Sequence, residues 1–225
     1  MFKFKLVMVT FSEENYLKAI YHLSRHGNDS VSTNAIANKI QTKASSVTDM
    51  IKKLADKELV NYKKYQGVEL TKKGRLMATT VIRKHRLWEV FLVEKLDFSW
   101  DEVHEIAEQL EHIRSEKLTE RLDSFLNFPT VDPHGDPIPD KDGVIHAHKN
   151  RVLSDLKPGE TGIIVGVKEH APSFLQYLEK NQLLLGSKVK VLNHFDFDHS
   201  LVIEANGNER TVSHQVSKNL YVAYE

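Results

Sequence analysis

The stretch STNAIANKIQTKASSVTDMIKKLADK, residues 32–57, decides the fold of the first part of the chain. Ser32 is a favourable N-cap, and the apolar residues after it recur at helical spacing, which predicts a short helix. Beyond the polar residues 41–43, a second helix is predicted over 44–57 by Val47, Met50, Ile51 and Leu54. Two short helices with a tight connection form a helix-turn-helix.

The flanking segments extend this motif into a winged helix. Upstream, Ser12 is predicted to cap a helix that carries Glu13 and Glu14 in its first turn. Downstream, residues 59–62 and 68–70 have the composition of short strands around a turn with glycine, which predicts a β-hairpin. A helix-turn-helix followed by a small hairpin is the winged-helix arrangement.

Basic residues concentrate in this part of the chain. Residues 31–75 contain ten Lys and Arg but only four acidic residues, although the whole chain has a formal net charge of zero. A basic helix-turn-helix favours binding to double-stranded DNA, and the alternative is a winged helix that binds another protein. The side chains predicted to contact DNA are Lys43, Ser45, Ser46, Thr48 and Lys52 on the second helix and Lys63, Lys64 and Tyr65 at the wing tip.

The next part of the chain is helical and acidic. Helices are expected over 75–96, from 100 to about 113 and onward to 126, before a loop rich in Pro, Gly and Asp over 127–143. Residues 97–125 hold nine acidic residues against three basic ones, which favours cations. Trp88, Phe91 and Leu92 offer apolar surface for a helical dimer interface, with burial in the core as the alternative.

Histidine and carboxylate side chains are paired along these helices. If the helical path continues through 101–122, then His104, Glu108, Glu111 and His112 share one face, and a His-x3-Glu pair recurs at residues 85 and 89. The chain contains no cysteine, so a metal site must use the nitrogen and oxygen donors that suit divalent cations. The alternative is a set of solvated charges on amphipathic helices.

Residues 153–225 change to a β pattern. Apolar segments at 162–167, 186–192, 200–204 and 220–222, around one helix over 172–180, predict a small β barrel. No apolar run approaches the roughly 20 residues that cross a bilayer, and the first residues lack the cleavage site of a signal peptide. We therefore expect no membrane segment and a cytoplasmic location.

Six motifs, in this order, resemble the diphtheria toxin repressor family of metal-dependent regulators. They are Tyr16-Leu17-Lys18-Ala19-Ile20, Ser45-Ser46-Val47-Thr48, Leu70-Thr71-x-x-Gly74, His85-Arg86-Leu87-x-Glu89, Glu108-x-x-Glu111-His112 and Asp132-Pro133-His134-Gly135-x-Pro137-Ile138-Pro139. The resemblance covers nearly the whole chain and implies an α+β multidomain protein. Its parts would be a winged helix-turn-helix domain at 1–74, a helical metal-binding and dimerisation domain at 75–143, a linker at 144–152 and an SH3-like, ferrous-transport-type β barrel at 153–225.

The resemblance also implies two metal sites. The ancillary site would use His85, Glu89 and His104, with His170 and the weaker donor Ser173 from the SH3-like domain. The primary site would use Glu108, Glu111 and His112 with Asn15 of the first helix, and the neighbouring Glu14 is the alternative to Asn15. Manganese-responsive members resemble one another in placing Glu at the position of Glu108, so Mn(II) is favoured over Fe(II) or Zn(II).

The function implied is that of a homodimeric repressor rather than an enzyme. It would respond to manganese, bind a palindromic operator when loaded with metal and control metal-uptake genes. The alternatives are an iron-responsive repressor of the same family and a winged-helix regulator without metal control. A metallohydrolase built on the carboxylates would leave the basic helix without a role.

Overall fold

The computed structural model describes residues 8–27, 29–63, 66–146 and 150–224. The chain divides into two compact units, described separately below. The first unit comprises residues up to 85 together with 109–115 and 139–145, and the second comprises 86–108, 116–138 and 146–225. Both units are assembled from separated segments, so the domain boundaries at residues 74, 143 and 152 stay a prediction.

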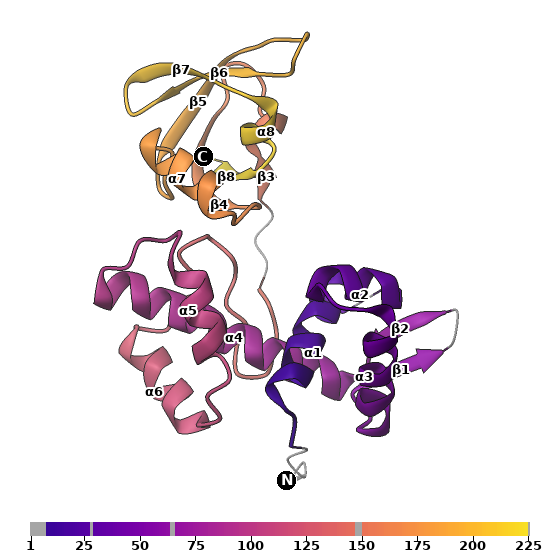
Figure 1. Cartoon of the computed structure of the whole chain (residues 1–225). Coiled ribbons are helices and arrows are strands. Elements are labelled where there is room, and N and C mark those ends of the chain that lie inside the picture. Colours follow the sequence, from indigo (N-terminus) through magenta and orange to yellow (C-terminus); the bar gives the residue numbers. More distant parts are fainter. Residues whose placement is uncertain (1–7, 28, 64–65, 147–149, 225) are drawn as a thin grey trace. The chain divides into compact units, whose positions relative to one another are not determined.

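The first unit contains the winged helix (Figure 1). Its elements are α1 (Phe11–Leu23), α2 (Thr33–Ile40), α3 (Ala44–Asp56), β1 (Val60–Lys63), β2 (Gly67–Leu70) and the first half of α4 (Lys72–Leu96). The two strands pair antiparallel, with Val60 opposite Leu70 and Lys63 opposite Gly67. The predicted helix-turn-helix and hairpin are therefore confirmed.

Helix caps explain where the first helices begin. Ser32 caps α2 as predicted, because its side chain accepts a hydrogen bond from the amide of Ala35. The prediction that Ser12 caps α1 is wrong, since Thr10 is the N-cap. The Thr10 hydroxyl accepts from the Glu13 amide at 3.3 Å, and the Glu13 carboxylate accepts from the Thr10 amide at 2.7 Å. This reciprocal box requires Glu three residues after the cap, and only Thr10 meets that spacing.

The apolar face of each helix packs into one core. Leu17, Ile36, Ile51 and Leu54 are fully buried there. Gly74 allows α4 to lie against the end of β1, because a Cβ atom at this position would approach the Leu59 carbonyl oxygen to 1.9 Å. The glycine of the Leu-Thr-x-x-Gly motif is therefore required by close packing.

The second unit contains the rest of the helical region. It holds the second half of α4, most of α5 (Val103–Leu110) and α6 (Glu116–Phe125). A continuous helix through 101–122 is wrong, because α5 ends at Leu110 and its carbonyl accepts the amide of Ile113 in a tight turn. Glu111 and His112 lie in that turn, so they do not share a helical face with His104 and Glu108.

The predicted apolar surface of α4 is partly buried. Leu92 is buried, whereas Trp88 and Phe91 are half-buried and pack on a cluster of Leu87, Val90, Leu122, Leu126 and Ile138. The loop predicted after α6 is confirmed, since residues 127–143 form turns and one isolated bridge between Val131 and Pro137.

The C-terminal part of the second unit is an antiparallel sheet. Its strands are β3 (Arg151–Val152), β4 (Thr161–Val167), β5 (Lys188–His194), β6 (Leu201–Ala205), β7 (Asn208–Val212) and β8 (Leu220–Tyr224), in the order β3-β8-β4-β5-β6-β7. The helix α7 spans Pro172–Lys180 as predicted, and η1 (Leu153–Asp155) and α8 (His214–Ser217) are short. The sequence did not reveal β7, because this edge strand is mostly polar.

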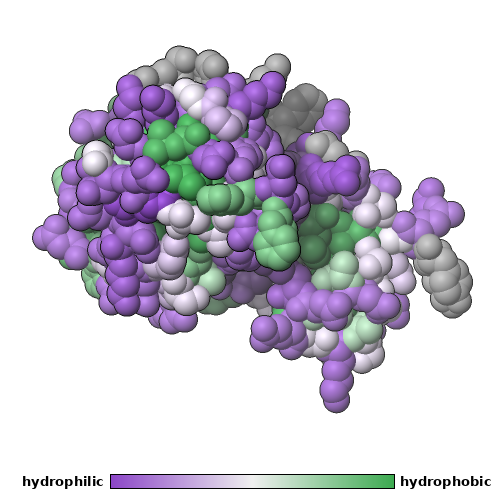
Figure 2. Space-filling model, turned by 90° about the horizontal axis from the view of Figure 1, so that it is seen from above, coloured by the Kyte–Doolittle hydropathy of each residue, from purple (hydrophilic) through white to green (hydrophobic). Residues whose placement is uncertain are grey.

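The visible surface of the protein is mostly hydrophilic, interrupted by small hydrophobic areas (Figure 2). Among the described residues, none of the helices combines the length and the apolar content needed to cross a bilayer.

Candidate metal centre

A first group of buried polar side chains lies in the first unit, where α1 meets the turn after α5. The Nδ1 atom of His112 lies 2.6 Å from the Glu14 carboxylate, and both side chains are almost completely buried. The ring of Phe11 stacks on His112 with centroids 4.8 Å apart, and Arg114 donates to the Val9 carbonyl at 2.6 Å. These contacts tie the first turn of α1 to His112.

Glu111 is the centre of this group, and its two oxygens have different surroundings. Its Oε2 atom accepts a hydrogen bond from Lys18 Nζ at 2.7 Å and lies 2.6 Å from His85 Nδ1. Its Oε1 atom is buried, lies 3.8 Å from His112 Nε2 and has no hydrogen-bond partner among the described residues. A buried acceptor without a partner is costly, so this oxygen is a suitable ligand for a cation.

The helical spacing of α1 decides which first-helix side chain reaches the group. Glu14 and Lys18 are four residues apart and therefore lie on one face. Asn15 is about 100° further round the helix and is exposed. The structure thus brings Glu14 to His112 and leaves Asn15 on the surface.

A second buried group lies in the second unit. Glu89, Asp132 and His134 each offer a ligand atom, and these atoms lie within 4.8 Å of one another. His134 Nδ1 is 3.8 Å from Glu89 Oε2 and 4.0 Å from Asp132 Oδ1, while His134 Nε2 lies 2.8 Å from the Trp100 carbonyl oxygen. The Asp132 carboxylate also accepts from the His134 amide at 2.8 Å, which fixes the loop.

The ionisable side chains of this second group shift one another's pKa values. Burial and the neighbouring Glu89 carboxylate raise the pKa of Asp132 to about 7. Burial alone would lower the pKa of His134, but the hydrogen bond and charge of Glu89 together with Asp132 raise it to about 9. Two buried carboxylates thus stabilise positive charge at the position of His134.

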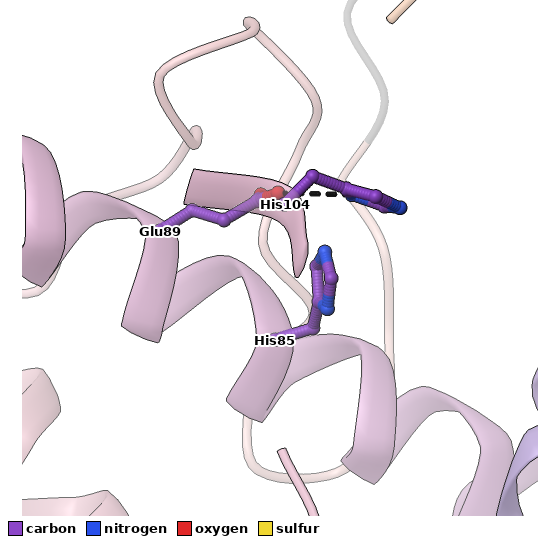
Figure 3. Close-up of side chains that lie close together, drawn as sticks. All are labelled: His85, Glu89 and His104. Atoms are coloured by element: carbon purple, nitrogen blue, oxygen red, sulfur yellow. Dashed lines mark hydrogen bonds and ion pairs between the residues drawn. The ribbon is translucent and has the colours of Figure 1, made fainter. Parts of the chain in front are cut away.

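Two further histidines adjoin this group. His104 Nδ1 lies 3.4 Å from Glu89, and Figure 3 shows Glu89 one turn after His85 on α4 with His104 beside it. The ring of His170 stacks on His134 with centroids 4.8 Å apart, and burial lowers the pKa of His170. The Nε2 atom of His170 is buried without a hydrogen-bond partner among the described residues. His170 therefore presents a buried imidazole nitrogen beside His134, whereas Ser173 is exposed on α7.

Asp132 and His134 were not among the ligands expected from the sequence. They lie in a loop where no helical spacing links them to Glu89, and their only signal was the Asp-Pro-His-Gly motif. Glu108 is about half exposed, and its Oε1 atom lies 3.9 Å from His104 Nε2.

The predicted DNA-contacting side chains lie mainly on the free surface of α3. Lys43, Ser45, Ser46 and Lys52 are exposed, as is Lys63 at the end of β1. Thr48 is half-buried and donates to the Ala44 carbonyl at 3.0 Å, so its hydroxyl is engaged within the helix. Lys64 and Tyr65 lie outside the described residues.

The donors of both groups suit a divalent metal ion. They are carboxylate oxygens and imidazole nitrogens without sulfur, the set that accommodates Mn(II), Fe(II) and Zn(II). Of the four buried side-chain atoms that have no hydrogen-bond partner among the described residues, Glu111 Oε1 belongs to the first group and His170 Nε2 adjoins the second. The residues present therefore fit a metal ion in both places.

Comparisons with known proteins agree with this organisation. Residues 8–68 match the N-terminal DNA binding domain of the iron dependent repressors, residues 71–140 match their metal binding and dimerisation domain, and residues 151–224 match the FeoA domain, which is SH3-like. The iron-dependent repressor IdeR of Mycobacterium leprae is 38% identical over 126 residues, which are 56% of this chain and 54% of that protein. The chain thus matches about half the length of such curated relatives.

Solved structures cover more of the chain. A manganese-dependent transcriptional repressor in complex with manganese is 35% identical, with a TM-score of 0.83 and coverage of 95% of this chain and 100% of that chain. ScaR with bound Zn2+ is 36% identical, with a TM-score of 0.75 and coverage of 95% and 99%. Three domain models and these solved structures agree over most of the chain. The chain therefore belongs to the iron-dependent (diphtheria toxin) repressor family, whose members are transcriptional regulators and not enzymes.

Proposed function

We propose that the protein is a metal-dependent transcriptional repressor that binds double-stranded DNA as a homodimer in the cytoplasm. The observation that carries this proposal is the buried group of Glu14, Glu111 and His112, because it joins the winged helix to the turn after α5. Without a cation, two carboxylates are held in a buried place beside an imidazole. A divalent ion would compensate their charge.

The primary ion would be held by Glu108, Glu111 and His112 together with a side chain of α1. The contact of Glu14 with His112 supports Glu14 as the fourth ligand in place of Asn15. The ancillary ion would be held by His85, Glu89 and His104, as the family resemblance implies. The buried positions of His134 and His170 beside Glu89 support a place for both in that site.

We favour Mn(II) as the physiological ion. The reasons are the Glu at position 108, the oxygen and nitrogen donors, and the likeness to a repressor described as manganese-dependent. Fe(II) is the first alternative, since the curated relatives are described as iron-dependent, and a likeness to a Zn2+-bound structure keeps Zn(II) as another. A winged-helix regulator without metal control would give no function to the buried carboxylate and histidine side chains at Glu111 and at Glu89.

Two adjacent residues of α1 link the primary group to the DNA-reading helix. Glu14 faces His112, whereas Glu13 accepts from Lys57 Nζ at 2.7 and 2.8 Å. Lys57 is the C-cap of α3 and also donates to the Met8 carbonyl at 2.9 Å. Fixing the first turn of α1 at His112 therefore also restrains α3. In a dimer, this sets the spacing of two reading helices, which must match major grooves roughly 34 Å apart.

The dimer is supported by apolar side chains on the helical part of the second unit. Phe125 and Phe128 are exposed by 61% and 65%, and Leu96 at the end of α4 by 51%. Exposed apolar side chains of this size favour a protein interface.

We propose that the regulated genes serve metal uptake.

The test measures DNA affinity with and without metal. Operator DNA is first selected from a random-sequence pool by the Mn(II)-loaded protein, and binding is then followed by fluorescence anisotropy in Mn(II) or in chelator. We expect chelation to abolish specific binding and Glu111→Gln, which removes one buried charge, to bind equally weakly in both conditions. Equal wild-type affinity in Mn(II) and in chelator would exclude metal control.

The DNA surface is tested separately by salt dependence. Lys52→Ala is expected to weaken binding to all sequences alike and to reduce the salt slope by about 1, because one phosphate contact is lost. An unchanged slope for this variant and for Lys43→Ala would mean that α3 does not lie along the DNA backbone.

A further inference from the structure

Lys18 places a positive charge inside the primary group. Its Nζ atom donates to Glu111 Oε2 at 2.7 Å and lies 3.4 Å from His85 Nδ1. Its side chain is only 13% exposed, and that of Glu111 is fully buried. An ammonium group therefore lies beside a carboxylate oxygen and an imidazole nitrogen, the two kinds of donor that a divalent ion would use.

The carboxylate of Glu111 faces two cation positions. On the Oε1 side lie His112 and, through it, Glu14, with no hydrogen bond to Oε1 among the described residues. On the Oε2 side, Lys18 and His85 are both in contact with the oxygen. One side therefore has a place for a metal ion, and the other already holds the ammonium group.

The position of Lys18 is fixed by α1. Tyr16, Leu17 and Ile20 around it are buried in the core of the winged helix, so the backbone at residue 18 is held in place. Lys18 follows Glu14 by one turn, which puts the two side chains on the same face. The long alkyl stem then carries the ammonium to Glu111, a contact that no flexible surface lysine would maintain.

We propose that Lys18 is a built-in counter-ion that occupies the cation position at Glu111 Oε2, beside His85, and so limits the group of Glu14, Glu111 and His112 to one divalent ion. The inference rests on the proposed primary site. A divalent ion on Oε2 would meet the ammonium at contact distance, and like charges in a buried site repel strongly. In the metal-free protein the same ammonium compensates part of the buried Glu111 charge through Oε2, and Oε1 is left for the metal ion.

The test counts Mn(II) ions per chain by isothermal titration calorimetry and by electron paramagnetic resonance. Lys18→Gln removes the charge and offers an amide oxygen, while Lys18→Arg keeps the charge as the matched control. We expect the wild type and Lys18→Arg to bind the same number of ions, and Lys18→Gln to bind one more. The additional ion would share the Glu111 carboxylate, so the resonance of Lys18→Gln would show a spin-coupled manganese pair. Equal stoichiometry in all three proteins would overturn the inference.

A second measurement uses the unaltered protein, in case Lys18→Gln does not fold. Reductive methylation of lysines is followed by mass spectrometry, with the exposed Lys52 as an internal reference. If Lys18 keeps its place, it reacts far more slowly than Lys52, both in chelator and in Mn(II). Rapid methylation of Lys18 after metal loading would mean that the ion displaces it, which overturns the inference.

Failure of the proposed function gives a different result. If the wild type and Glu111→Gln bind the same number of ions with the same affinity, Glu111 is not a ligand and the primary site itself is wrong. If Glu111→Gln loses an ion while Lys18→Gln gains none, the primary site stands and only the role of Lys18 falls.

Discussion

At the scale of single residues, the choice between two neighbouring side chains of α1 decides the chemistry of the primary site. Glu14 lies 2.6 Å from His112 in a buried place, while Asn15 is exposed. We expect Glu14→Gln to weaken Mn(II) binding by at least about tenfold, since loss of even an outer partner of a metal ligand costs 10–100-fold. Calorimetric titration measures this change.

Asn15→Ala is the matched control for this substitution. It alters the adjacent position of the same helix and should leave Mn(II) affinity unchanged, because the side chain faces away from His112. If Asn15→Ala weakens Mn(II) binding and Glu14→Gln does not, the ligand from α1 is Asn15, as the sequence analysis proposed.

A second prediction at this scale concerns His170. Its ring stacks on His134, and burial without a hydrogen-bond partner for Nε2 keeps a lone pair available. We expect His170→Ala to lower the affinity for the second ion by about tenfold to a hundredfold, by the same reasoning about metal ligands and their partners. Ser173→Ala, a nearby exposed position on α7, should have no effect. Unchanged affinity in His170→Ala would leave Glu89, Asp132 and His134 to bind the ion without help from the SH3-like domain.

The candidate ligands stay predictions, and where the structure places a side chain differently from the expectation the difference has a physical reason. Spacing along a helix showed that residues 14 and 15 were candidates, but it could not tell which one faces inward, since that depends on packing. His134 was harder to find because its partner Glu89 lies on α4, 45 residues earlier in the chain. Lys18 is part of the Tyr-Leu-Lys-Ala-Ile motif, but that motif gave it no function. Its contact with Glu111 is what indicates one.

At the scale of elements, the first turn of α1 depends on the Thr10 capping box. Thr10→Ala removes the side-chain acceptor for the Glu13 amide and should lower the free energy of unfolding by about 1 kcal/mol. Ser12→Ala, at an exposed position of the first turn, should change it by less than about 0.5 kcal/mol. Urea denaturation of the metal-free protein measures both. A larger loss in Ser12→Ala than in Thr10→Ala would restore Ser12 as the cap.

The elements themselves were largely predictable because their periodicity is local. The range of α7 was predicted to the residue, and the helix-turn-helix and wing follow from caps, apolar spacing and the glycine turn. The break at Leu110 was not predictable, since Glu111 and His112 continue the helical pattern while their side chains are buried by contacts with α1 and α4. Strand β7 was hidden by its polar composition.

At the scale of the whole molecule, metal binding and DNA binding must influence each other equally. If Mn(II) raises DNA affinity by a given factor, DNA raises Mn(II) affinity by the same factor, because the two equilibria form a closed cycle. The ion pair between Glu13 and Lys57 is the described contact that joins the first turn of α1 to the end of α3. We therefore expect Lys57→Met to reduce both factors to the same extent. Mn(II) affinity in the absence of DNA should stay close to that of the wild type, because Lys57 does not touch the metal ligands.

Calorimetry with Mn(II), in the presence and absence of selected operator DNA, measures this coupling, and anisotropy with and without Mn(II) gives the reciprocal factor. Lys53→Met is the matched control, since it alters an exposed lysine one turn earlier on α3. Loss of coupling in Lys57→Met but not in Lys53→Met would place the link at the first turn of α1. Undiminished coupling in Lys57→Met would mean that the metal acts on α3 by another route, and the restraint of α3 would then have to pass through the apolar core shared by α1, α2 and α3.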